Sequence, residues 1–114
     1  MPSATHIAAP HAELEDWPIP AEQIAAGQPR ARGTVLHDGP EGTGCGVWEC
    51  TPGTFDWVYD THQSLCVLSG EAEVEIAGGA RLTLAPGDAA FFPAGTRARW
   101  TVRQTLRKVY TTYR

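Results

Sequence analysis

Long apolar stretches are missing from this chain of 114 residues. The longest runs, such as the one at 89–92, span only a few residues and are too short to cross a bilayer. The N-terminus has no basic region followed by an apolar stretch, so we expect no secretory signal. Disorder of the whole chain is excluded too, because 42% of the residues are hydrophobic and only 19% are charged.

Cysteine is scarce, and Cys45, Cys50 and Cys66 form no Cys-x-x-Cys pair. The odd number, the wide spacing and the missing signal favour reduced thiols in a cytoplasmic protein. Turn formers are abundant instead. The 12 Gly and 9 Pro residues make up roughly 18% of the chain, against about 12% on average. This composition argues against a helical bundle, and the length predicts one domain.

Net positive charge is also lacking: the formal net charge is −4, which gives no support for nucleic-acid binding. The distribution is uneven, because the segment 1–80 holds 12 of the 13 acids and only 2 of the 9 bases. Two interpretations are open. The two parts interleave in one fold and neutralise each other, or the basic part binds an acidic partner.

The chain divides into an N-terminal arm, 1–32, and one domain, 33–114. We expect 1–12 to be partly disordered, 13–31 to lie on the domain, and 20–27 to form one helical turn ended by Gly27. From Gly33 onward turns recur every 8–12 residues, which indicates an all-β sandwich or closed barrel. The predicted strands are 34–37, 46–51, 55–59, 64–68, 71–76, 81–85, 89–92, 97–103 and 105–113.

Gly87, Pro93 and Gly95 stand at the spacing Gly-x5-Pro-x-Gly. Together with the strand pattern, this resembles the second motif of the cupin superfamily, which implies a jelly-roll β-barrel. The chain is most similar to small cupins of the ureidoglycine aminohydrolase and ethanolamine-utilisation types, many of unknown function. The resemblance covers roughly residues 46–110 and implies a homodimer. It rests on the segments 46–49, 55–57, 68–70, 86–88, 92–95, 100 and 107–110.

The resemblance also identifies where metal ligands would stand. Cupins hold a metal with three His and one acid, and the matching positions here are Trp57, Tyr59, Gln63 and Ala98. None is His or an acid, and only Tyr59 is a conceivable ligand. His62 cannot rebuild the site, because strand alternation points it away from the interior if Gln63 points in. We therefore expect no metal and no other cofactor.

Alternation assigns the interior residues of the barrel. Trp57 and Trp100 point inward, where they either fill the space or line a pocket. Lys108 points into the barrel or its mouth and needs a partner, for which Glu49 is the nearest candidate acid; the alternative is that both face solvent. The candidate ligand-binding residues are Glu49, Trp57, Tyr59, Gln63, Trp100 and Lys108.

Four functions are compatible with this set. The first is a metal-free cupin that binds a small polar or anionic metabolite through Lys108. The second is an enzyme without metal, in which Lys108 or Tyr59 acts as general acid or base. The third is a metalloenzyme of the ureidoglycine aminohydrolase type acting on a small C–N compound, and the fourth is a dimeric scaffold without ligand. We expect a small-molecule ligand and a homodimer, and no nucleic-acid or membrane partner.

Alternation also predicts the outer surface. It points Glu71, Glu73 and Glu75 outward on one strand and Arg97, Arg99 and Arg103 outward on another. In the jelly roll that the resemblance implies, these two strands lie side by side and antiparallel, so the acidic stripe should face the basic stripe. Opposite charges across strands contribute roughly 0.2–1 kcal/mol each. The alternative is that the basic stripe binds an acidic partner.

Overall fold

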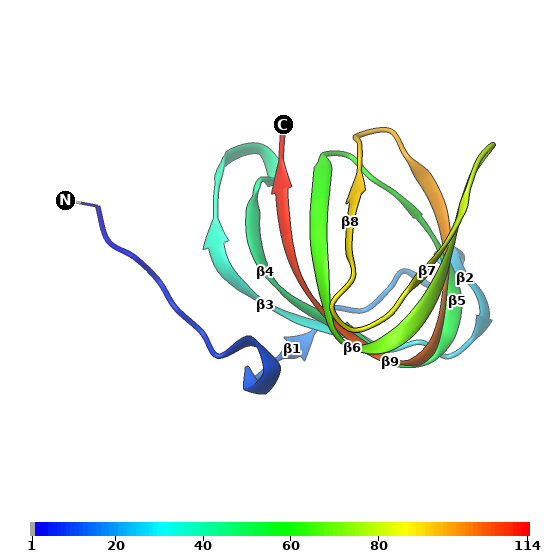
Figure 1. Ribbon diagram of the computed structural model, residues 1–114, viewed down its shortest axis with the longest axis horizontal. Helices are drawn as coiled ribbons and strands as arrows, with labels where there is room; N and C mark the ends of the chain where they lie inside the picture. Colours follow the sequence, from blue (N-terminus) through cyan, green and yellow to red (C-terminus); the bar gives the residue numbers. More distant parts are fainter. Residues whose placement is uncertain (1) are drawn as a thin grey trace.

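The computed structural model describes residues 2–114, and its strands curve round a common interior (Figure 1). This part of the chain contains nine strands and three short 3-10 helices. The strands are β1 Glu15–Asp16, β2 Ile24–Gly27, β3 Ala31–Asp38, β4 Gly44–Cys50, β5 Gly53–Val58, β6 His62–Ile76, β7 Arg81–Leu84, β8 Ala89–Phe92 and β9 Arg97–Tyr113. The 3-10 helices are Ala9–His11, Ala21–Gln23 and Pro40–Gly42.

Two long antiparallel strands, β6 and β9, run side by side through the middle of the fold. The first part of β9 also pairs with β5, and its last part pairs with β4. On its other edge, β6 pairs first with β8 and then with β7. The two bent strands therefore belong to both halves of a jelly roll, which confirms the predicted all-β, jelly-roll fold.

The predicted strand breaks near residues 69–70 and 104 do not occur, because both segments continue as one strand. The pairing of β6 with β9 is irregular between Val67 and Ala72. Gly70 adopts φ +86°, and a Cβ there would lie 2.0 Å from the Thr105 carbonyl oxygen. Glycine thus permits a bulge and a close backbone approach, so the strand bends instead of ending in a turn.

The N-terminal arm supplies two strands to the sheet: β1 pairs with β3, and β2 pairs with β5. The predicted helical turn over 20–27 is wrong beyond Gln23, because Ile24–Gly27 pairs with the β5 edge instead of continuing as a helix. Trp17 packs on Gly33 so closely that a Cβ there would lie 2.2 Å from the indole ring. Because Gly33 has no side chain, the Trp17 ring can pack directly against β3, and this contact holds the arm on the barrel.

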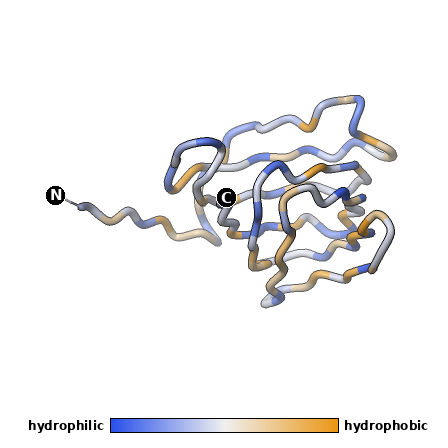
Figure 2. The backbone as a smooth tube through the Cα atoms, turned by 90° about the horizontal axis from the view of Figure 1, so that it is seen from above, coloured by the Kyte–Doolittle hydropathy of each residue, from blue (hydrophilic) through white to orange (hydrophobic). Residues whose placement is uncertain are grey.

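The core occupies the inside of the barrel. Phe55, Leu65, Val67, Trp100 and Val102 are all less than 5% exposed, which confirms the inward positions predicted by alternation. Along the strands, hydrophobic and hydrophilic residues follow one another at short intervals (Figure 2). Within residues 2–114, no helix has the length and apolar character needed to cross a membrane.

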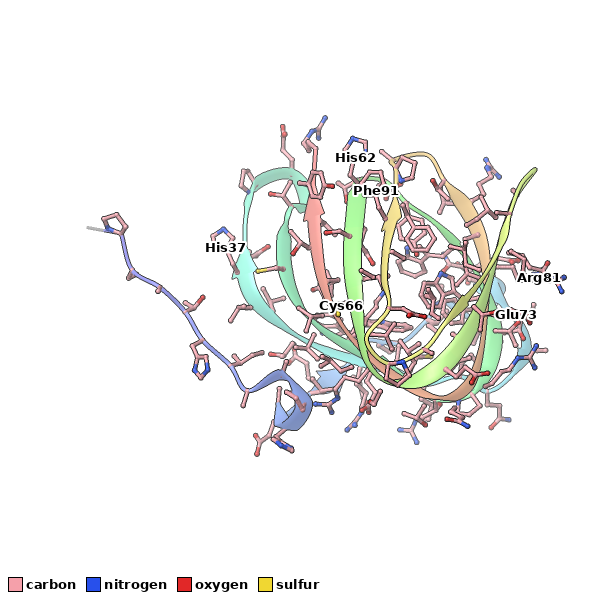
Figure 3. All side chains as sticks on the ribbon, viewed as in Figure 1. His37, His62, Cys66, Glu73, Arg81 and Phe91 are labelled. Carbon is pink, nitrogen blue, oxygen red and sulfur yellow. The ribbon has the colours of Figure 1, made fainter. Side chains whose placement is uncertain are left out.

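The predicted neighbouring charge stripes are confirmed in part. β6 lies beside β9, and Glu73 forms an ion pair with Arg103. Arg81 on β7 contacts Glu73 and Glu75 from the other side (Figure 3). Arg99 pairs instead with Asp56, because β5 lies against the opposite edge of that part of β9. Acids and bases from distant parts of the sequence thus neutralise each other within the sheet.

Candidate functional site

A cavity of about 440 Å³ lies inside the barrel. Its walls come from four strands and from the arm, because the inward faces of β4, β5, β6 and β9 converge there and β1 and its continuation cover one side. Five of the six residues predicted to bind a ligand line it: Trp57, Tyr59, Gln63, Trp100 and Lys108. The other lining residues are Asp16, Trp17, Pro18, Ile19, Trp48, Phe55 and Tyr110.

Lys108 is the basic residue among those that line this cavity, and its side chain points inward as predicted. It is 7% exposed. Its Nζ donates a hydrogen bond to Gln63 Oε1 at 3.0 Å and lies 4.6 Å from the centre of the Trp48 ring and 4.9 Å from that of Trp100. No carboxylate within residues 2–114 forms an ion pair with it. The amine is therefore held by an amide and two indole faces.

Burial lowers the pKa of Lys108 to about 7, because the apolar surroundings disfavour the charged ammonium. The indole faces and the Gln63 oxygen act in the opposite direction, since both favour a cation. The nearby Cys50 thiol stays protonated, because burial raises its pKa to about 12. Near neutral pH the site thus contains comparable amounts of ammonium and neutral amine.

Tyr59 and Trp100 form a buried polar pair beside Lys108. The Trp100 Nε1–H donates to Tyr59 Oη at 3.1 Å. The Tyr59 ring stacks on Phe92 with a centroid separation of 4.7 Å. Burial raises the pKa of Tyr59, so this residue keeps its hydroxyl proton. A cavity ligand would therefore meet a phenol that can donate a hydrogen bond, but no phenolate.

The aromatic walls differ in depth. Trp48, Phe55 and Trp100 pack against one another with ring centroids 6.1–6.3 Å apart. Trp57 is 38% exposed although it lines the cavity, so it lies at the rim, where the cavity meets solvent. The two predicted aromatic residues thus have different positions: Trp100 forms part of the core wall, and Trp57 flanks the mouth.

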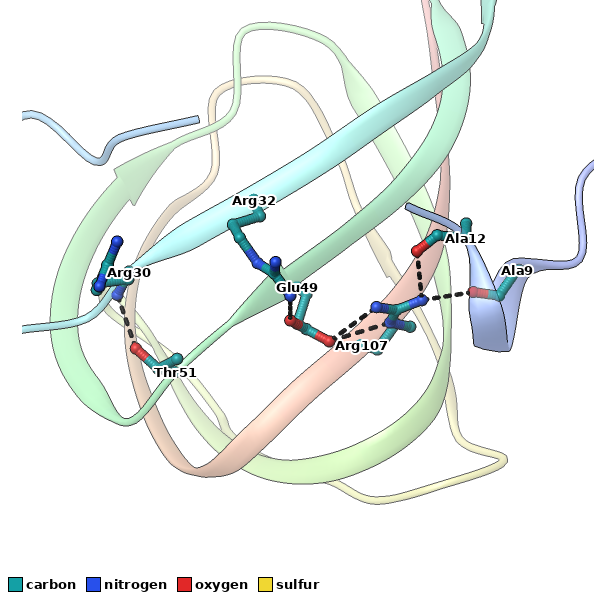
Figure 4. A network of polar contacts seen from close by, with 7 residues as sticks. All are labelled: Ala9, Ala12, Arg30, Arg32, Glu49, Thr51 and Arg107. Carbon is teal, nitrogen blue, oxygen red and sulfur yellow. Dashed lines mark hydrogen bonds and ion pairs between the residues drawn. The ribbon is translucent and has the colours of Figure 1, made fainter. Parts of the chain in front are cut away.

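The prediction that Glu49 faces the interior is wrong. Glu49 does not line the cavity; its carboxylate lies on the outside between Arg32 and Arg107 (Figure 4). Trp48 takes the inward position on β4, so alternation turns its neighbour outward. Burial opposes ionisation of Glu49, but the hydrogen bonds from Arg32 and Arg107 outweigh it and lower the pKa. Glu49 is thus a structural anion.

The same network holds the arm. Arg107 Nη1 donates to the carbonyl oxygens of Ala9 and Ala12 at 2.9 and 3.2 Å (Figure 4). Its guanidinium also binds Glu49, so a sheet carboxylate orients the arginine that contacts the arm. This places the first part of the arm outside the barrel wall, while residues 16–19 cover the cavity.

His62 and Cys66 point outward, as alternation predicts, because Leu65 and Val67 on the same strand are buried and Gln63 lines the cavity. Neither lines the cavity, and Cys66 is exposed. His62 Nδ1 accepts a hydrogen bond from the Ala94 backbone N–H at 3.0 Å, and its ring lies beside Phe91 and Tyr113. Cys45, Cys50 and Cys66 form no disulfide in this structure, and their reduced state stays a prediction.

The cavity residues do not fit a metal ion. At the four family positions, Trp57 lies at the rim, Tyr59 binds Trp100, Gln63 binds the Lys108 ammonium, and Ala98 has no donor atom. No group of three or more His, Cys, Asp or Glu side chains in the described chain is arranged to hold a metal. A first-row cation needs about three or four N, O or S donors in one place, and the cavity side chains do not supply them.

The arm supplies the part of the site that local sequence patterns do not predict. The sequence indicates only that Trp17, Pro18 and Ile19 belong to a segment lying on the domain, whereas in the structure they form one wall of the cavity. The signal was the apolar Trp-Pro-Ile-Pro stretch, whose prolines enforce an extended backbone. The position of this stretch at the cavity depends on the pairing of β1 with β3, which no local sequence pattern predicts.

Comparison with known proteins agrees with the fold. Residues 40–110 match the EutQ-like cupin domain family. A curated relative, "Acetate kinase EutQ" of Clostridioides difficile (strain 630), is 30% identical over 79 residues, which cover 69% of this chain and 49% of that protein. The chain therefore spans about half the length of this curated relative.

Two solved structures illustrate the similarity. A DUF861 family protein from Thermotoga maritima is 37% identical, with a TM-score of 0.57 over 59% of this chain and 76% of the other. The Clostridium difficile EutQ protein is 23% identical, with a TM-score of 0.73 over 95% and 85%, and supports the fold. The family match includes more than half of the chain and most of the cavity-forming strands. This chain therefore belongs to the family of EutQ-like cupin domains.

Proposed function

We propose that this protein is a metal-free cupin that binds a small molecule in the barrel through an anionic or otherwise electron-rich polar group placed against Lys108. The observation that carries the proposal is the position of Lys108: 7% exposed, inside the cavity, with Gln63 as its hydrogen-bond partner and no ion pair among residues 2–114. A buried ammonium without an anion is costly, and a ligand carboxylate would remove that cost.

The surroundings favour a ligand with a flat apolar body. An ammonium has three N–H donors, of which Gln63 Oε1 accepts one. Trp48 and Trp100 cover the amine, and Trp57 stands at the mouth, so a ring or short chain attached to the anionic group would contact indole surfaces. Small aromatic or unsaturated carboxylates therefore fit the site better than sugars or other highly hydroxylated molecules.

Binding of such an anion is coupled to proton uptake. The ligand favours the ammonium, whereas the pKa of about 7 leaves a growing share of neutral amine as the pH rises. Affinity should therefore be greatest below pH 7 and fall about tenfold for each further pH unit above it. Asp16 at the cavity wall and the hydroxyls of Tyr59 and Tyr110 are the other titratable groups that face this space.

The test uses benzoate, its neutral analogue benzamide and its cationic analogue benzylamine at pH 6. Calorimetry and quenching of tryptophan fluorescence report binding. Charge-assisted hydrogen bonds contribute about 1.5–3 kcal/mol, so benzoate should bind roughly ten- to a hundredfold more tightly than benzamide, and benzylamine more weakly still. Lys108→Met should abolish the preference for benzoate, and the matched control Arg97→Met, which removes an exposed positive charge, should keep it. Equal binding of all three compounds, or none, would contradict the proposal.

We also propose that the chain forms a homodimer, as its family resemblance leads us to expect. Support comes from the outward face of β6, β8 and β9, where Phe91 is 53% and Tyr113 41% exposed. Cys66, which lies on β6 nearer to the bend at Gly70, is also exposed. Two copies with net charge −4 can meet on such an uncharged face without like-charge contacts. Light scattering should give a dimer mass for the natural chain and a monomer mass for Phe91→Asp.

A further inference from the structure

Lys108 is the only lysine in the sequence, and it is buried in the cavity. The other eight basic residues counted as Lys or Arg are arginines, whose guanidinium groups are poor nucleophiles because they stay protonated. Apart from the terminal α-amine, Lys108 Nζ is therefore the only primary amine in the sequence, and it lies inside the cavity. The wall around this amine is aromatic, and its one hydrogen-bond partner within residues 2–114 is the neutral Gln63 amide.

We propose that Lys108 Nζ acts as a nucleophile toward the carbonyl carbon of a small aldehyde in the cavity and binds it reversibly as an imine. This inference rests on the proposed function, because it requires a cavity that admits small molecules. It adds a covalent reaction and a substrate class, small aldehydes with an apolar body. The apolar body follows from the indole rings of Trp48 and Trp100, whose centres lie 4.6 and 4.9 Å from the amine.

The reaction needs no oxidant, reductant or metal. The nitrogen lone pair forms an N–C bond as the C=O π-electrons move to oxygen, and a proton passes from nitrogen to that oxygen to give a carbinolamine. Loss of the hydroxyl group as water, with the second N–H proton, then forms the C=N bond. One amine and one aldehyde thus yield one imine and one water, and water reverses the sequence.

Three features of the site favour this chemistry. Burial lowers the pKa of Lys108 to about 7, so a neutral amine is present at neutral pH, whereas an ordinary lysine is almost wholly protonated. The Tyr59 hydroxyl lines the same cavity and can donate a hydrogen bond to the developing oxygen anion. Cys50 does not compete as a nucleophile, because burial keeps its thiol protonated.

The experiment traps the imine by reduction. The full chain is incubated with benzaldehyde and sodium cyanoborohydride between pH 6 and pH 9, and intact mass and peptide mapping then locate each added benzyl group. We expect one benzyl group on Lys108, with a rate that rises through pH 7 and levels off. The terminal α-amine, which also reacts, shows that the reagents are active. Benzoate at pH 6.5 should slow labelling of Lys108 but not of the terminus.

A matched variant shows whether the labelling rate depends on burial of the lysine or only on the presence of a lysine in the chain. Arg97 is exposed, so the double variant Lys108→Met, Arg97→Lys again carries one lysine, now on the surface. At pH 7.5 the natural Lys108 should be labelled about tenfold faster or more than this surface lysine. The comparison of Lys108 with the terminal amine within the natural chain needs no variant. Because α-amines have an ordinary pKa of about 8 and are partly neutral at this pH, we expect there only that Lys108 is labelled at least as fast as the terminus.

The outcomes distinguish this inference from the proposed function. If benzoate binds but Lys108 remains unlabelled while the terminus reacts, the imine inference is overturned and the binding function stands. Labelling of Lys108 no faster than the surface lysine also overturns it, because the cavity then confers no special reactivity. If benzoate fails to bind and Lys108 is still labelled rapidly, the carbonyl chemistry stands and the preference for anions is wrong.

Discussion

Replacing Lys108 with methionine should make the protein more stable at low pH and should remove part of its pH dependence. Methionine has a similar length and no charge, so it suits an aromatic cavity. The folded pKa of Lys108 is about 7 and its ordinary value is 10.5. Between these values the unfolded chain binds the extra proton and the folded chain does not, so stability rises with pH in this window and falls as pH drops toward 7.

The magnitude follows from the two pKa values. Each tenfold change in proton affinity corresponds to about 1.4 kcal/mol, so Lys108 costs about 5 kcal/mol of folding free energy below pH 7. Methionine removes this cost but leaves the Gln63 oxygen without its donor, which costs about 1–3 kcal/mol. The net gain for Lys108→Met at pH 6 should be about 2–4 kcal/mol. Between pH 6 and pH 8.5 this advantage should shrink by about 2 kcal/mol.

Urea unfolding followed by tryptophan fluorescence measures the effect at pH 6, 7, 8 and 8.5. Groups common to both proteins cancel in the difference between the natural chain and Lys108→Met. The range stops below pH 9 because the Lys108 charge acts on the pKa of the buried Cys50 thiol, so the contribution of this thiol differs between the two proteins at higher pH. Arg97→Met serves as the control and should give a curve parallel to that of the natural chain. A constant difference between the natural chain and Lys108→Met from pH 6 to pH 8.5 would refute the argument.

Three further perturbations test the surrounding structure. Tyr59→Phe removes the acceptor of the buried Trp100 N–H and should lower the free energy of unfolding by about 1–3 kcal/mol in urea titrations. Gly33→Ala places a methyl group where the Trp17 ring lies, so it should displace the arm and increase acrylamide quenching of tryptophan fluorescence. Chelation with EDTA should leave the melting temperature unchanged, and metal analysis should find well under one first-row metal ion per chain; a stoichiometric metal lost together with stability would show that the donor set was misjudged.

The sequence alone determined the all-β class and much of the cavity. Turn residues recur often, and the spacing of Gly87, Pro93 and Gly95 is typical of a cupin motif. Alternation then placed Trp100 and Lys108 inside, and both are buried. These predictions succeed because side-chain direction in a strand has a period of two residues, which makes it a local property of the backbone.

Only the tertiary structure determined which groups surround the Lys108 amine. Local reasoning pairs Glu49 with it because a buried ammonium needs an anion, but Glu49 faces Arg32 and Arg107 on the outer surface. That outcome depends on the pairing of β4 with β3 and β9, which brings two arginines from distant segments to one carboxylate. Contacts between remote segments have no signature in a short window of sequence.

Contacts between remote segments also determined where β6 continues and where the arm runs. The Gly70 region looks like a turn in isolation, yet pairing of β6 with β9 on either side of it carries the strand through a bulge. Trp17 reaches the cavity only because Gly33 of β3 leaves room for its ring. The low pKa of Lys108 has the same origin: desolvation depends on everything that surrounds the amine in the folded barrel, and no single stretch of the chain contains that information.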